Sequence, residues 1–533
     1  MANIHVEKVK EDSFPGKNQW LRSKINYGFG TYRGLLTITI VYEFILILTL
    51  GSFSEPMVNL LGAPLLPITL DDGTRVARIV MLYHSFALPF VAAITYFILE
   101  FCDVRKNWES RTKILIFPGS MIASICGILF AYFFPHNWII HGLFIFGLSL
   151  VFLGGLFLFI GVFPWKKFPD PEKKLDGPYL FGINIAQVAL ALFVFCVLVS
   201  TIIGAAAGAY FGNGFEAFLA EHVLIERHLV HTLFEAAIIS HLHIMLALID
   251  VGILLVVFRY TFPEQQGRWY LASMVLTIPG ILVMSIGAWL VTIADEINLP
   301  FDSHYLIYAG AAILLLAGIV LAFTGWKKTS KEILGNSYDS SSRFTRIKAA
   351  FKDPVKLGLY FQFIWVNIVM TLPGIFLALS LRDDSILTRI TGIPSFRESG
   401  PEFVELMVAR GHWHVLATLS AIIMLLLALD YLNVQGRVRQ VIGWILNIGS
   451  ILGFLFAVIF IYSPHFDPRI TQSIYYGVAN VEAIIDTYIA NTPLMQLSFL
   501  IIDLGIVLFV FGLIMFCFHQ LIEILKGKMD VTG

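Results

Sequence analysis

The sequence predicts an all-α polytopic membrane protein, and three observations carry this prediction. The chain of 533 residues is 57% hydrophobic and only 14% charged, whereas soluble globular domains carry about 25% charged residues. Its mean hydropathy is +0.79. Apolar stretches long enough to cross a bilayer as helices recur twelve times. Helices satisfy their own backbone hydrogen bonds, which is essential in lipid.

The composition excludes several other classes of protein. With 36 Lys+Arg against 37 Asp+Glu, the chain lacks the basic excess of a nucleic-acid binder, and its 14% aromatic content argues against disorder. The four cysteines form no CxxC pair, so we expect no disulfide framework, thiolate zinc site or covalently attached c-type haem. The first 33 residues lack the features of a signal peptide, so the first span is expected to be an uncleaved anchor.

We predict one membrane domain over residues 1–533, with twelve transmembrane helices in three pseudo-symmetric four-helix blocks. The blocks are 34–162, 181–324 and 357–518, preceded by a cytoplasmic tail (1–33) and separated in one place by a basic inner loop (325–356). The predicted spans are 34–54, 78–101, 113–134, 138–162, 181–211, 230–258, 270–294, 304–324, 357–381, 413–434, 442–463 and 496–518.

The basic residues predict the orientation of these spans. With the N-terminus inside, 28 Lys+Arg lie in inner segments and 8 in outer segments, which leaves none in the interior of a span. Basic residues concentrate on the cytoplasmic side of membrane proteins. Both termini are therefore expected to be cytoplasmic.

A repeated motif supports the division into blocks. The segment "SHLHIMLALID" (Ser240–Asp250) resembles "GHWHVLATLSA" (Gly411–Ala421), and each is followed by the tripeptide Gln-Gly-Arg, at 266–268 and 435–437. Both copies lie in the second helix of a block, and the second helix of the first block also carries a histidine, His84. Threefold symmetry would place these three helices around a common axis.

Five histidines enter these three spans: His84, His241, His243, His412 and His414. An ionisable side chain inside a membrane is costly and indicates a functional site, although a lone histidine can equally be hydrogen-bonded to a neighbouring helix. In a helix, positions i and i+2 lie about 200° apart, so an HxH pair serves two partners on opposite sides. A flat macrocycle between helices needs one axial histidine from each. We therefore expect the set to ligate haem iron.

These residues resemble the haem-copper oxidase superfamily, which includes the catalytic subunit of cytochrome oxidases and the large subunit of nitric oxide reductases. The motifs "ARGHWHVLATLS" (409–420) and "YHSFALP" (83–89) are closer to the nitric oxide reductase branch. The resemblance implies that His84 and His414 are the axial pair of a low-spin haem and that His412 binds a second haem. It also implies that Arg469, in "HFDPR", lies near haem propionates.

The chain departs from this family at the second metal. The family takes an adjacent His-His pair from span 7, but residues 270–291 contain no histidine, so we predict no copper site. Span 6 has two histidines instead, and His243, or else His241, would face His412 across a second haem with two axial histidines. His241 could also face span 2 or bind a third cofactor, and these alternatives stay open.

Catalytic residues are not identified, and Glu235 with His231 are weak candidates. They are spaced i, i+4 at the outer end of span 6. Ten residues separate His231 from His241, a rise of about 15 Å in a helix, which is too far for one ion. An outer-face proton path or docking contact fits them better. Three further carboxylates could belong to a proton route, although interfacial hydration is the plainer interpretation: Asp250, Asp430 and Asp503.

A haem with two axial histidines has no vacant position for a gas, so the pattern favours electron transfer. We expect an oxidoreductase component: a respiratory-complex subunit with two b-type haems near the outer face. Its expected partners are an outer-face cytochrome c-like protein or quinone, other membrane subunits and the bilayer, with no nucleic acid. We expect it in a prokaryotic-type inner (plasma) membrane. The alternatives are a divergent terminal oxygen or nitric oxide reductase and a haem-free proton or metal transporter.

Overall fold

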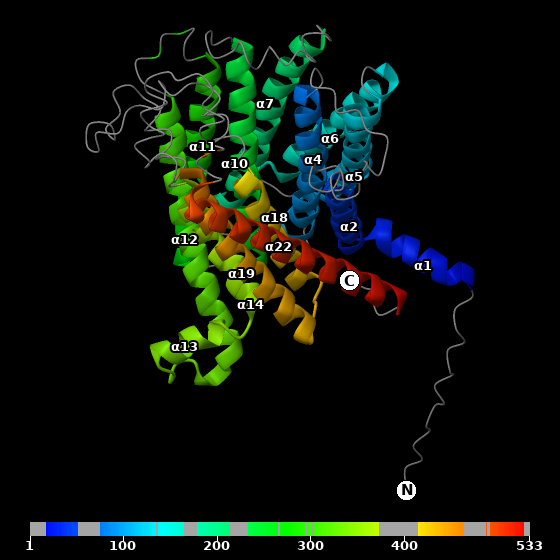
Figure 1. Cartoon of the computed structure of the whole chain (residues 1–533). Helices are drawn as coiled ribbons and strands as arrows, with labels where there is room; N and C mark the ends of the chain where they lie inside the picture. The colour runs from blue at the N-terminus through cyan, green and yellow to red at the C-terminus, as the bar shows by residue number, and fades with distance from the viewer. Residues whose placement is uncertain are drawn as a thin grey trace.

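The computed structural model is all-α apart from one short hairpin within the residues it describes. These are 17–51, 75–134, 137–164, 179–213, 233–264, 267–293, 303–371, 414–462 and 491–526, with the single positions 297, 299 and 487. They form fourteen α-helices (Figure 1). The helices are α1 (Lys17–Gly30), α2 (Tyr32–Gly51), α4 (Arg75–Phe101), α5 (Lys106–Ile128), α6 (Trp138–Val162), α7 (Ile185–Asn213), α10 (Leu233–Thr261), α11 (Arg268–Ile293), α12 (His304–Leu334), α13 (Arg343–Ala350), α14 (Pro354–Val366), α18 (His414–Tyr431), α19 (Gly436–Tyr462) and α22 (Pro493–Leu525).

Short elements complete the described part of the chain. π-Helical turns extend α5 (η2, Leu129–Phe133) and α14 (η5, Asn367–Thr371), and a 3₁₀ turn follows α12 (η4, Gly335–Ser337). Strands β1 (Tyr179–Leu180) and β2 (Ile183–Asn184) form an antiparallel hairpin before α7.

The prediction of long apolar membrane helices is confirmed for ten spans. Ten helical segments among the described residues are long and apolar enough to cross a bilayer. Two shorter apolar helices, 354–369 and 418–431, coincide with the predicted spans 357–381 and 413–434. Large apolar side chains remain exposed along these helices, for example on α6 and α22, where lipid is their natural neighbour. The chain is therefore an integral multi-pass membrane protein.

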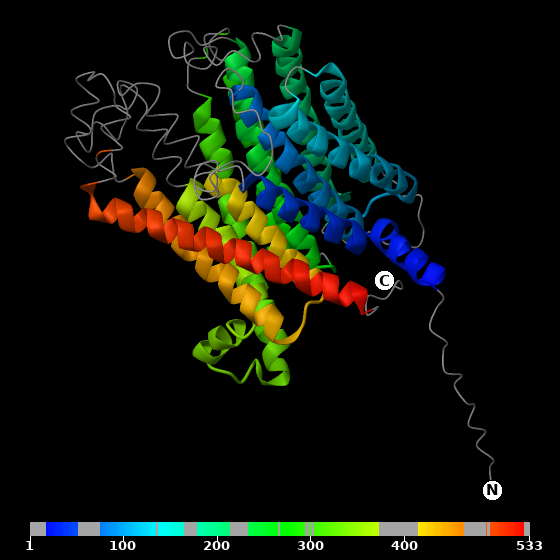
Figure 2. The same cartoon turned by 45° about the vertical axis from the view of Figure 1, so that its right-hand side comes forward.

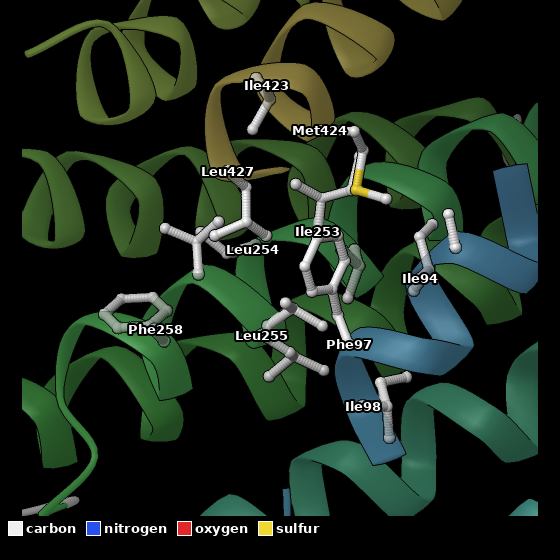
Figure 3. Packing of buried hydrophobic residues seen from close by; sticks show 14 of the residues in the cluster. Ile94, Phe97, Ile98, Ile253, Leu254, Leu255, Phe258, Ile423, Met424 and Leu427 are labelled. Atoms are coloured by element: carbon white, nitrogen blue, oxygen red, sulfur yellow. The ribbon is translucent and has the colours of Figure 1, made fainter. Parts of the chain in front are cut away.

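The main hydrophobic core lies where α4, α10 and α18 meet. Figure 3 shows Phe97 of α4 packed among side chains of α10, with Met424 of α18 nearby, and all belong to one buried cluster. Leu254 and Phe258 on α10 are 4% and 1% exposed, so this helix is covered by protein and not by lipid. The three helices that carry the span histidines thus share one core.

The glycine of the repeated Gln-Gly-Arg tripeptide has a positive φ in both copies, at the junction of successive helices. Gly267, between α10 and α11, has a φ of 105°, and Gly436, at the start of α19, has a φ of 69°. Residues with a Cβ are strained in this region of backbone conformation. The two copies of the motif are therefore explained by the same backbone requirement.

Two segments expected to lie between or before the spans contain helices. Part of the predicted tail 1–33 forms α1, and the predicted inner loop 325–356 contains the end of α12, all of α13 and the start of α14. Local caps explain the breaks in this second segment. The Ser342 side chain accepts from the Thr345 amide at the start of α13, and Asp353 accepts from the Lys356 amide at the start of α14.

A charged network joins the adjacent ends of α10, α14, α18 and α19, the last of which packs along α22 (Figure 2). The Arg439 guanidinium forms ion pairs with Asp353 (2.8 Å) and Asp430 (2.6 Å). The Tyr260 hydroxyl donates to the second oxygen of Asp430 at 2.9 Å. Asp430 was interpreted from the sequence as a hydrated interfacial group, but it has partners on two other helices.

Candidate functional site

Two of the five span histidines have described side chains, and the structure brings them together. His84 of α4 and His241 of α10 lie with their ring centroids 6.3 Å apart and their ring planes 13° from parallel. That His241 faces span 2 was one of the alternatives the sequence left open. The side chains of His243 and His414 lie outside the described residues, although both positions belong to helices.

The remaining predicted site residues cannot be placed against this pair. His412, His231 and Arg469 lie outside the described residues, and only the backbone position of Glu235, in α10, is described. The pairing of His84 with His414, which the family resemblance implies, is therefore untested by these contacts. The His84–His241 pair is the described part of the candidate site.

His241 is held by the neighbouring helices α7 and α11. Its Nδ1 lies 2.8 Å from the backbone carbonyl oxygen of Ser200 on α7. Because a carbonyl oxygen only accepts, Nδ1 carries the hydrogen, and the lone pair of the neutral ring is on Nε2. The Trp289 indole of α11 donates to the Ser200 hydroxyl at 3.1 Å, which ties the same turn of α7 to α11. Metal-ligating histidines typically have such a second hydrogen bond.

Gly204 makes room for the His241 ring. It lies one helical turn after Ser200, and a Cβ at this position would lie 2.4 Å from both Cε1 and Nδ1 of His241. Such a distance is well inside van der Waals contact, so α7 can pack this closely against the imidazole because position 204 lacks a side chain. Ser200 and Gly204 together determine where the ring lies.

Replacing Gly204 with alanine is expected to displace the His241 ring and break its bond to Ser200. Overpacking of this kind costs about 1–3 kcal/mol of stability. Thermal unfolding of the detergent-purified protein measures the loss. Gly142→Ala on α6 is the matched control, since its Cβ would meet no atom within 4 Å. Equal destabilisation by the two substitutions would contradict this role of Gly204.

The His84 side of the pair is lined by aromatic rings and a small polar network. Phe144 of α6 meets the His84 ring edge-on, with centroids 6.1 Å apart. The following residue, Ser85, donates to the Ser124 carbonyl oxygen of α5 at 3.1 Å, while the Ser124 hydroxyl donates to the Ser85 carbonyl oxygen at 2.6 Å. These reciprocal bonds hold α4 to α5 beside His84.

The two rings are stacked with their centroids 6.3 Å apart, a separation that two axial ligands of one metal centre would also have. Among the described residues, no three His, Cys, Asp or Glu side chains are grouped closely enough to hold an ion. Metal–imidazole bonds are about 2 Å long, so ligands on opposite sides of one ion have nitrogens about 4 Å apart, and their ring centres lie farther out. A centroid separation of 6.3 Å with nearly parallel planes fits this arrangement.

Two carboxyl groups inside the helix bundle, Asp250 and Glu43, have surroundings that the sequence did not predict. Asp250, near the middle of α10, accepts a hydrogen bond from the Ser420 hydroxyl of α18, so it is an interhelical group and not only a hydrated interfacial one. Glu43 of α2 was missed altogether, and its Oε1 is buried without a hydrogen-bond partner. The signal was visible as a lone glutamate in the apolar run "IVYEFIL".

Comparisons with known proteins leave the family of this chain open. No family model matches the sequence, no curated protein matches it, and no solved structure resembles the fold. The resemblance to haem-copper oxidases therefore rests on the motifs alone. The chain belongs to the broad class of helical multi-pass membrane proteins.

Proposed function

We propose that this protein is a haem b-containing electron-transfer subunit of a respiratory membrane complex. The observation that carries the proposal is the His84–His241 pair, with nearly parallel rings on two packed helices and the Nδ1 of one ring bonded to a carbonyl. This arrangement leaves the Nε2 lone pair of His241 for a metal. A haem held there would supply a one-electron carrier.

A second haem extends the proposal to the residues whose side chains the structure does not describe. His412 and His243 would provide its axial ligands, and His414 would be the alternative to His241 opposite His84, since a haem iron has two axial positions. Arg469 would pair with propionates. The described contact joins His84 to His241, whereas the family resemblance pairs His84 with His414. Which haem His414 and His243 each bind is therefore the first point of this proposal to test.

The predicted topology indicates on which side of the membrane electrons would be exchanged. Twelve spans with both termini in the cytoplasm would place the histidines in the outer half of a prokaryotic-type inner membrane. Electrons would then be exchanged with an outer-face cytochrome c-like protein or with quinone, next to other membrane subunits. Axial ligation on both sides of the iron favours electron transfer over gas reduction.

Optical spectroscopy together with metal analysis of the purified chain tests the proposal. We expect bound iron, a Soret band, a b-type reduced-minus-oxidised spectrum and no stoichiometric carbon monoxide adduct. A ready adduct of the reduced protein would favour the terminal reductase instead. Correctly folded protein without a Soret band would overturn haem binding and favour a transporter.

A further inference from the structure

One carboxyl oxygen of Glu43, Oε1, is buried in the membrane-spanning part of α2 without a hydrogen-bond partner. None of the ion pairs among the described residues includes Glu43. An isolated ionised carboxylate in an apolar environment is strongly disfavoured. The group must therefore be protonated, or be hydrated by water, for at least part of its working cycle.

Other unpartnered polar groups lie on the helices around Glu43. Thr39 is one turn earlier on α2, so the two side chains share a face, and Thr39 neighbours the Tyr96 hydroxyl of α4. Thr39 and Tyr96 are each 1% exposed. Their two hydroxyls interact with each other, although outside ordinary hydrogen-bond geometry, and the buried Thr112 hydroxyl of α5 has no hydrogen-bond partner. Buried polar groups in native proteins are nearly always satisfied, often by ordered water.

Hydrogen bonds at both ends connect this unpartnered stretch to the rest of α4 and α5. Towards the end that the basic residues mark as inner, the Tyr32 hydroxyl donates to Glu109 of α5 at 2.6 Å. At the other end, the Tyr42 hydroxyl lies 2.7 Å from the Ser124 hydroxyl. Ser124 in turn donates to the backbone of Ser85, the residue after His84.

We propose that Glu43 is a proton-binding group on a hydrated polar path, which runs through α2, α4 and α5 from the inner surface to the site at His84. The path is defined by Tyr32, Glu109, Thr112, Thr39, Tyr96, Glu43, Tyr42, Ser124 and Ser85. Water satisfies its unpartnered oxygens and delivers the proton. Glu43 takes up this proton when an electron enters the haem, since the added negative charge favours the protonated carboxyl. This step rests on the proposed function.

The other titratable groups along this part of α2 do not replace Glu43 in that role. Tyr42 is its neighbour in the chain, Cys126 of α5 lies near Tyr42, and Tyr96 of α4 lies near Thr39. On α22, which also packs against α2, Asp503 is exposed. Tyrosine and cysteine ordinarily titrate well above neutral pH. Apart from the exposed Asp503, Glu43 carries the one carboxyl among these groups, and a carboxyl without a partner in an apolar environment favours its protonated form.

Redox titration of the purified full chain at several pH values tests the inference. The haem midpoint potential should fall as pH rises in the wild type, because reduction binds a proton, and it should become independent of pH in Glu43→Gln. Glu43→Asp should retain the dependence. Asp503→Asn, a span carboxyl on the exposed face of α22, is the matched control and should behave as wild type.

The inference is overturned if the wild-type midpoint potential does not depend on pH, or if Glu43→Gln keeps the wild-type dependence. Both results leave haem binding intact. If Glu43→Gln does not accumulate, reduced-minus-oxidised infrared spectra decide: a protonated-carboxyl C=O band that shifts in Glu43→Asp supports the inference, and its absence overturns it. Protein without haem defeats the proposed function separately. In that case, infrared spectra at two pH values test proton binding by Glu43 alone. Proton binding is overturned if no protonated-carboxyl C=O band shifts in Glu43→Asp.

Discussion

Replacing His241 with alanine is expected to lower the haem content of the purified protein by about tenfold or more. The substitution removes a proposed axial ligand whose ring is already oriented by the Ser200 carbonyl at 2.8 Å. The folded core should persist, because the main cluster lies farther along α10, around Leu254 and Phe258. Haem per protein, measured as the pyridine haemochrome, reports the loss.

His519→Ala is the matched control for this experiment. His519 lies near the C-terminal end of α22 and is not one of the span histidines, and its replacement should leave the haem content unchanged. A His241→Ala protein with full haem content and an unaltered spectrum would refute ligation by His241. In that case His84 would pair with His414, as the family resemblance implies, and His84→Ala should remove the haem.

Replacing Arg439 with methionine is expected to destabilise the protein by about 2–4 kcal/mol, somewhat less than the 3–5 kcal/mol typical of a broken buried pair. The substitution leaves Asp353 and Asp430 facing each other without their shared cation. Their side chains are 22% and 9% exposed, so water screens the repulsion only in part. The expected result is a lower unfolding temperature in detergent.

The neighbouring Arg437 supplies the control for this prediction. It is exposed and lies two residues earlier in α19, so Arg437→Met should change stability by less than about 0.5 kcal/mol. The loss in Arg439→Met should diminish when Asp430→Asn is combined with it, because one of the two uncompensated charges is then gone. Strictly additive effects of the two substitutions would contradict a shared network.

The sequence by itself determined the membrane class and most of the helix positions. Lipid tolerates only long apolar helices with internally satisfied backbones, so hydropathy alone located segments such as 138–162, which α6 matches at both ends. The same constraint made histidines in the spans conspicuous, since ionisable groups are rare at that depth. It underestimated segment 325–356, where polar composition concealed the capped helix α13.

Only the tertiary structure decided which side chains meet. The HxH motif predicted that His241 and His243 point to different sides of one helix, but the partner on each side depends on how α10 packs against its neighbours. That packing placed His241 beside His84, against a glycine of α7 that has no sequence signature of its own. Glu43 likewise became significant through what surrounds it, because burial without a partner is a property of contacts between helices and not of any one segment.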